Sequence, residues 1–91
     1  LTIDVKKHEV TVEGEPVSLT LKEFELLRRM MKNLGIVLTR DQLLEDIWGY
    51  DFDGETRTVD VHVRTLRQKL GKAGELIETV RGVGYKMREQ A

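Results

Sequence analysis

The stretch that decides the fold is "RTVDVHVRTLRQKLGK", residues 57–72. It carries five Lys or Arg residues and one Asp, although the whole chain of 91 residues holds 15 basic and 16 acidic side chains. At the helical spacing of about 100° per residue, four aliphatic side chains fall on one face. This stripe consists of Val59, Val63, Leu66 and Leu70. The stretch is therefore predicted to form an amphipathic helix over residues 57–70, with the stripe in the core.

The opposite face of this helix holds groups that can read DNA in the major groove. Arg can donate two hydrogen bonds to guanine, Gln can pair with adenine, and Val or Thr can pack on the thymine methyl group. A solvated face is the alternative, but such faces mix acids with bases, and Asp60 is the only acid in this stretch. Asp60 is expected to serve the helix dipole or an internal Arg pair. The groove-facing side chains are Arg57, Val61, Arg64, Thr65 and Gln68.

The charge of the chain is unevenly distributed along its length. Residues 1–55 hold 7 basic and 12 acidic side chains, whereas residues 56–88 hold 8 basic and 3 acidic ones. A local basic field can attract a polyanion although the molecule as a whole is nearly neutral, with chance segregation of charge as the alternative. The chain has no cysteine, which excludes disulfides and thiolate zinc sites, and no apolar run approaches the roughly 20 residues of a membrane span.

Residues 1–19 are predicted to form an antiparallel sheet of two or three strands. Val10 and Val12 alternate there with polar neighbours, and Val and Thr favour strands. The segment 13–15, Glu-Gly-Glu, indicates a hairpin turn, and Pro16 suits an edge strand.

Two further helices are predicted between this sheet and the basic helix, which gives a three-helix core over residues 20–70. Thr20 with Glu23, and Thr39 with Gln42, form capping-box patterns that mark their starts. The first helix is expected to end near Gly35 and the second at Gly49. The apolar stripe of the first helix is Leu21, Phe24, Leu27, Met31 and Leu34, and that of the second is Leu43, Leu44, Ile47 and Trp48.

Residues 76–88 are predicted to form a β-hairpin around a turn at residues 81–84. Arg81 lies at its tip, with Lys86 and Arg88 behind it. An Arg at such a tip can enter the narrow minor groove of DNA, with a solubilising surface charge as the alternative. The order of a sheet, three helices and a hairpin outlines one α+β domain over residues 1–91, a winged helix-turn-helix.

Four segments together resemble the effector domain of OmpR/PhoB-type response regulators. They are "LTLKEFELL" (19–27), "LTRDQLLEDIWGYD" (38–51), "RTVDVHVRTLRQKL" (57–70) and "IETVRGVGY" (77–85). The resemblance implies a winged helix with a four-stranded N-terminal sheet, a recognition helix and a C-terminal wing. It implies a sequence-specific, double-stranded DNA-binding regulator of a two-component system in the bacterial cytoplasm, with no cofactor. The resemblance also implies a receiver domain upstream that is phosphorylated on Asp, and the start at Leu1, not Met, suggests a piece excised from a longer protein.

The resemblance also implies partners and site residues. The partners are direct-repeat DNA, a second copy bound head to tail, RNA polymerase, and a cognate histidine kinase acting through the receiver domain. Thr65 and Arg67 take base-facing or groove-facing positions, although many relatives have Arg where this chain has Thr65. The implied backbone contacts are Arg57, Thr58, His62 and Arg64 from the helix, with Trp48 and Tyr85, and the wing contacts are Thr79 and Arg81.

The loop over residues 49–55 is expected to touch RNA polymerase, again by resemblance. Exposed acids and aromatics could meet a basic polymerase surface; the alternative is that Trp48 and the loop aromatics close the core. The loop residues concerned are Tyr50, Asp51, Phe52, Asp53 and Glu55.

Three rival interpretations remain open. An enzyme is not expected, because His8, His62 and Ser18 show no nucleophile–base or metal-ligand spacing. A protein-interaction module would bind its partner through the exposed helix, and it would lack the steep salt dependence of phosphate contacts. The same domain could also be fused to a transmembrane sensor instead of a receiver domain, which the residues upstream of Leu1 would settle.

Overall fold

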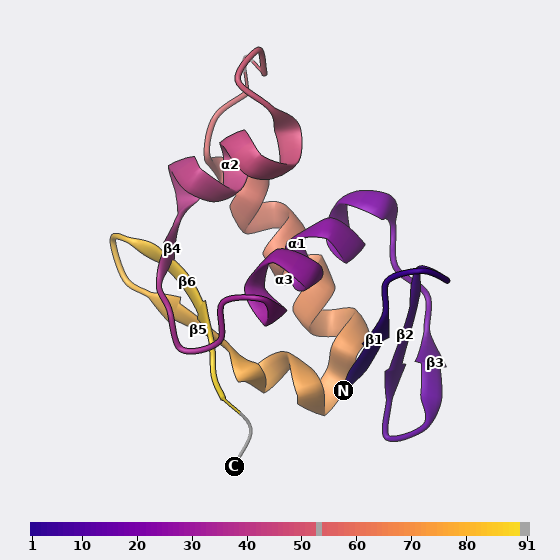
Figure 1. Ribbon diagram of the computed structural model, residues 1–91. Helices are drawn as coiled ribbons and strands as arrows, with labels where there is room; N and C mark the ends of the chain where they lie inside the picture. The colour runs from indigo at the N-terminus through magenta and orange to yellow at the C-terminus, as the bar shows by residue number, and fades with distance from the viewer. Residues whose placement is uncertain (53, 90–91) are drawn as a thin grey trace.

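The computed structural model describes residues 1–52 and 54–89, and its helices lie between two small sheets (Figure 1). The elements in chain order are β1 (Thr2–Asp4), β2 (Glu9–Val12), β3 (Glu15–Val17), α1 (Leu21–Met31), β4 (Leu38–Thr39), α2 (Arg40–Trp48), α3 (Arg57–Leu70), the 3-10 helix η1 (Gly71–Leu76), β5 (Ile77–Val80) and β6 (Gly84–Met87). This order confirms the predicted α+β winged helix-turn-helix. Within the described ranges, no helix is both long and apolar enough to cross a bilayer.

The N-terminal sheet is antiparallel in the order β1-β2-β3. Its second turn uses Glu13 and Gly14 at φ values of 52° and 81°, the positive pair that a tight two-residue hairpin requires. Pro16 lies on the edge strand β3, as predicted. The expectation of a fourth strand in this sheet is wrong, because the chain passes from β3 directly into the cap of α1.

The fourth strand of the chain joins the wing instead. β4 pairs with β6 through Leu38 and Tyr85, which makes a second sheet in the order β4-β6-β5. Gly84 permits this contact, because a Cβ atom there would lie 2.0 Å from the carbonyl oxygen of Leu38. The wing is therefore fixed to the start of α2, and it is not a free hairpin.

Both predicted capping boxes are confirmed. The amide of Thr20 donates to Glu23 over 2.8 Å and the amide of Glu23 donates back to Thr20, and Thr39 and Gln42 repeat the arrangement at the start of α2. α2 ends at Gly49, as expected. α1 ends earlier than expected, at Met31.

The apolar stripe predicted for α1 is partly wrong. Leu21 is 58% exposed and Leu34 42% exposed, whereas Leu26 and Met30 are fully buried. α1 packs against α2, α3 and β6 together, which buries Leu26 and Met30 outside the predicted stripe, and Leu34 lies beyond the end of the helix at Met31. The stripe of α3, in contrast, is confirmed, since all four of its members are buried.

Candidate nucleic-acid interface

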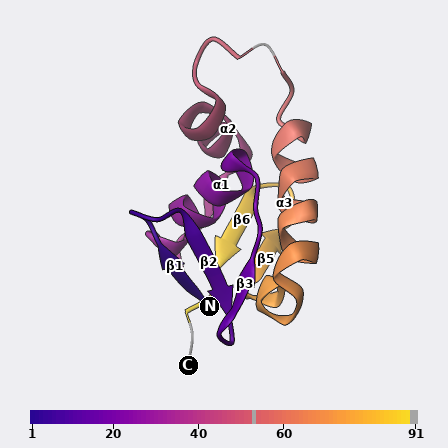
Figure 2. The same cartoon turned by 90° about the vertical axis from the view of Figure 1, so that its right-hand side faces the viewer.

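The outer side of α3 is a straight line of exposed side chains. Val61 is 52% exposed. α3 lies along one edge of the molecule, so no other element covers this side (Figure 2). The line follows the spacing i, i+4, i+7, i+11 of one helix face. Its members are Arg57, Val61, Arg64 and Gln68.

The cations of α3 and the wing divide into two groups. Lys69 pairs with Glu23 over 2.7 Å, and Lys86 and Arg88 both meet Glu78. Among the residues that the structure describes, no ion pair involves Arg57, Arg64, Lys72 or Arg81. Among the described residues, the outer line and the wing tip therefore carry cations that are not in ion pairs, although the chain as a whole has a net charge of −1.

Asp60 joins α3 to both α2 and the wing. Its carboxylate accepts a hydrogen bond from Arg40 Nε over 2.8 Å and another from the hydroxyl of Tyr85. Burial raises the pKa of Asp60, but the hydrogen bonds from Tyr85 and Arg40 outweigh that effect and hold the pKa below its usual range. The expected internal Arg pair is thus confirmed. Tyr85 itself is only 4% exposed, and burial together with its bond to Asp60 raises its pKa.

Arg67 and Thr79 meet each other at the junction between α3 and β5. The Arg67 guanidinium donates to the carbonyl oxygen of Ile77 over 2.7 Å and to the Thr79 hydroxyl over 2.7 Å. It also lies 5.5 Å from the ring centroid of Tyr85. The contacts that orient the wing against α3 are thus made by residues that were predicted to contact DNA, namely Arg67, Thr79 and Tyr85.

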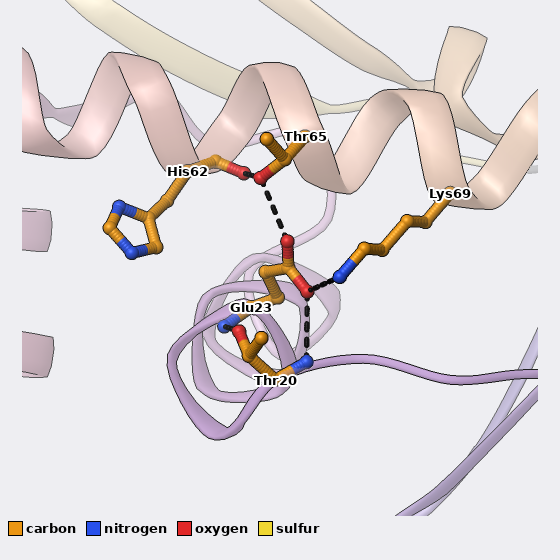
Figure 3. Close-up of polar contacts among 5 residues, drawn as sticks. All are labelled: Thr20, Glu23, His62, Thr65 and Lys69. Carbon is orange, nitrogen blue, oxygen red and sulfur yellow. Dashed lines mark hydrogen bonds and ion pairs between the residues drawn. The ribbon is translucent and has the colours of Figure 1, made fainter.

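A buried carboxylate of α1 holds the other half of α3 (Figure 3). Glu23 is 3% exposed and accepts hydrogen bonds from Thr65 Oγ1, Lys69 Nζ and the Thr20 amide over 2.7–2.8 Å. Burial alone would raise the pKa of Glu23, but the bonds from Lys69, Thr20 and Thr65 lower it to about 2. The sequence pattern indicated only the capping role of Glu23, and its hydrogen bonds with Thr65 and Lys69 of α3 were not predicted.

The Glu23 contact changes the expected role of Thr65. Its hydroxyl hydrogen is directed to Glu23, or to the carbonyl oxygen of His62 at 3.0 Å, and both groups are acceptors. Thr65 is half-buried beside α1, whereas Arg64 and Gln68 are exposed. Thr65 therefore lies at the margin of the outer line.

Comparison with known proteins gives the family. A model described as "Transcriptional regulatory protein, C terminal" matches residues 14–87. The chain is an OmpR/PhoB-type effector domain. The transcriptional regulatory protein VxrB of Vibrio cholerae is 56% identical over 88 residues, which cover 97% of this chain and 35% of VxrB. The chain thus spans less than half the length of curated relatives such as this one.

Solved structures agree with this assignment. The response regulator DrrB of Thermotoga maritima, an OmpR/PhoB homolog, superimposes with a TM-score of 0.87 at 32% identity, covering 96% of this chain and 41% of DrrB. The DNA-binding domain of Klebsiella pneumoniae RstA, in complex with the RstA box, gives a TM-score of 0.83 at 37% identity over 94% of this chain and 88% of that one. The effector domain described here is a winged-helix, DNA-binding domain of a transcriptional regulator.

At the start of α3, the effector domain has a small aromatic cluster. The Trp48 ring meets His62 edge-on at 4.8 Å between centroids and lies 6.2 Å from Phe52. His62 Nδ1 lies 2.8 Å from the carbonyl oxygen of Thr58; because a carbonyl only accepts, Nδ1 carries the hydrogen and Nε2 faces elsewhere. Trp48 is half-buried in this cluster, so it packs between α2 and α3.

The loop after α2 is mostly exposed. Tyr50 is 86% exposed, so it does not close the core, and Phe52 is 37% exposed. Asp51 and Glu55 are exposed as well, while Asp53 lies outside the described residues. Elsewhere in the described chain, no three His, Asp or Glu side chains gather as a metal site would require.

Proposed function

We propose that this domain binds double-stranded DNA sequence-specifically, with α3 in the major groove. The outer line of α3 carries the proposal: two guanidinium groups that make no ion pair with a described residue flank an exposed Val, and an exposed Gln follows. An α-helix fits the major groove, where Val61 can meet a thymine methyl group and Gln68 an adenine. Arg57 and Arg64, at the start and middle of the line, suit phosphates on the groove walls.

Further contacts are proposed around this line. Thr58 and His62 would meet phosphate near the start of α3, and Trp48 would add a backbone contact from the end of α2. Thr65 would meet a base edge only through its methyl group or as an acceptor. Three further residues would act chiefly by orienting the wing and would contact DNA in addition: Arg67, Thr79 and Tyr85.

The wing tip is proposed to enter the minor groove. Arg81 is exposed beside Gly82 in the β5–β6 turn, and the negative potential of DNA is deepest where the minor groove is narrow. Both groove contacts would then come from elements that Asp60 and Arg67 hold together.

The remaining proposals concern the whole protein. The loop residues Tyr50, Asp51, Phe52, Asp53 and Glu55 are proposed to contact RNA polymerase, because an exposed Tyr beside acids suits a basic protein surface. We further propose that the whole protein works in the bacterial cytoplasm. It would bind direct repeats as a head-to-tail dimer and carry an upstream receiver domain phosphorylated through a cognate histidine kinase.

Arg64→Ala tests the placement of α3. Its affinity for a specific and a nonspecific duplex should fall by similar factors, and the slope of log affinity against log salt should shrink by about one unit. Lys32→Ala, which removes an exposed cation directly after α1, is the matched control and should leave both unchanged. A loss confined to the specific duplex would contradict the phosphate role of Arg64. Salt-independent binding, or none, would favour a protein-interaction module.

A further inference from the structure

A second basic surface lies away from the outer line of α3. It is a groove of about 510 Å³ between α1 and α2. These two helices lie on one side of the molecule and α3 on the other (Figure 2). Four cations and two carboxylates line the groove: Lys22, Arg28, Arg29, Lys32, Glu25 and Asp46.

Both carboxylates of the groove are already engaged. Asp46 accepts from Arg29 Nε over 2.8 Å, and Glu25 lies 3.8 Å from Lys22 Nζ. Lys22 also donates to the carbonyl oxygen of Ile47 over 2.8 Å, near the end of α2. Arg28 and Lys32 are different: neither takes part in an ion pair within residues 1–52 and 54–89.

Arg28 has an unusual feature for a surface cation. Its Nε atom is buried, and no hydrogen-bond acceptor reaches it among the described residues. Buried donors in folded proteins are almost always paired, because an unpaired one costs free energy. Because Nε is itself closed off, an incoming acceptor would reach Arg28 only at the outer nitrogens of its guanidinium group.

We propose that the α1–α2 groove binds an acidic segment of a partner protein. Arg28 and Lys32 are four residues apart on one helix face, so their side chains are neighbours about one turn apart. Two carboxylates of an Asp- or Glu-rich segment can meet both, and a guanidinium binds a carboxylate through two parallel hydrogen bonds. The four cations follow α1 over about 15 Å, a length that suits a peptide better than a single small anion.

A protein segment fits the groove better than a second nucleic acid does. Glu25 and Asp46 lie among the cations, and they would repel a continuous row of phosphates. A partner bound here would leave α3 and the wing free, so it could bind at the same time as DNA. The acidic loop after α2 and this basic groove would then offer two surfaces of opposite charge to the transcription machinery.

A peptide titration tests the proposal. The probe is a fluorescein-labelled octapeptide of alternating Glu and Ala, titrated with the whole 91-residue chain at low salt and followed by anisotropy. The double variant R28Q/K32Q removes both unpaired charges and keeps the helix-forming length of the side chains. It should bind the peptide about three- to ten-fold more weakly, the combined effect of two exposed ion pairs. R64Q, which removes one cation from the outer line, is the matched control and should bind it as the wild type does.

The same titration with saturating DNA distinguishes the groove from α3. Peptide affinity should be unchanged by DNA, and amide NMR shifts should move at Arg28, Arg29 and Lys32. Displacement of the peptide by DNA, or equal binding by R28Q/K32Q and wild type, would overturn the proposal. A labelled single-stranded oligonucleotide that binds the groove in the presence of duplex, with R28Q/K32Q sensitivity, would also overturn it in favour of a second nucleic-acid site. The comparison of R28Q/K32Q with wild type in the absence of DNA does not depend on whether α3 enters the major groove.

Discussion

The inner and outer sides of α3 differ in whether their charged side chains are in ion pairs. On the inner side, Asp60 and Lys69 each meet a partner of opposite charge from another element. On the outer side, Arg57 and Arg64 meet none in the described part of the chain. The acids near α3 are thus used for folding, and the cations left over face outward. This is how a chain with a net charge of −1 can present a positive surface.

The two inner junctions are themselves unequal. Glu23 is a buried carboxylate of α1 with three donors, whereas the side chain of Asp60 is 37% exposed and has two. Solvent screens a partly exposed pair, so the Asp60 junction should contribute less to stability. The inner side is therefore expected to govern folding, most strongly through Glu23, and the outer side DNA affinity.

Glu23→Ala should give the largest effect. The substitution removes the buried carboxylate that pairs with Lys69, and it also removes the capping box. The free energy of unfolding should therefore fall by about 3 kcal/mol. Urea unfolding near neutral pH measures it. Glu23→Gln, which keeps a capping-box side chain but not the charge, should lose roughly half as much. If Glu23→Ala lowers the free energy of unfolding no more than Glu23→Gln does, the capping box and the hydrogen bond with Thr65 contribute little to stability.

Acid should weaken the same junction. The pKa of Glu23 lies at about 2 in the folded chain against an ordinary 4.5. A carboxyl with a lowered pKa stabilises the folded state above its unfolded pKa, and this contribution is lost as the pH falls from about 5 to about 2. The loss should be on the order of 2 kcal/mol. Urea unfolding at several pH values, compared with Glu23→Gln, isolates it; parallel curves for the two proteins would assign the acid sensitivity to other groups.

The sequence predicted what local patterns determine. Both capping boxes, the end of α2 at Gly49, the buried stripe of α3 and the wing turn depend on neighbours in sequence. The partnership of Glu23 with Thr65 joins residues 42 positions apart, and no local pattern encodes it. The same holds for the exposure of Leu21, the pairing of β4 with β6, and the use of Arg67 to hold the wing.

Asp60→Asn should have an intermediate effect. Asn keeps an acceptor for Arg40 and Tyr85 but loses the charge, so unfolding free energy should fall by about 1.5 kcal/mol, less than for Glu23→Ala. Specific DNA binding should weaken more than nonspecific binding, because the wing loses part of its attachment to α3. Thermal melts and binding to both kinds of duplex measure this. Equal stability of Asp60→Asn and wild type would show that the junction is only a surface contact.

Arg81→Ala should affect stability least and tests the outer side alone. Arg81 is an exposed turn residue, so its removal should change unfolding free energy by no more than a few tenths of a kcal/mol. DNA affinity should still fall by about 1 kcal/mol, the size of one hydrogen bond. The preference for A·T pairs beside the site should also flatten, because the minor groove is narrow there. Competition between A·T-rich and G·C-rich flanks at one salt concentration measures that preference for both proteins. If Arg81→Ala keeps the wild-type flank preference, the wing does not read the groove, and the outer side acts through charge alone.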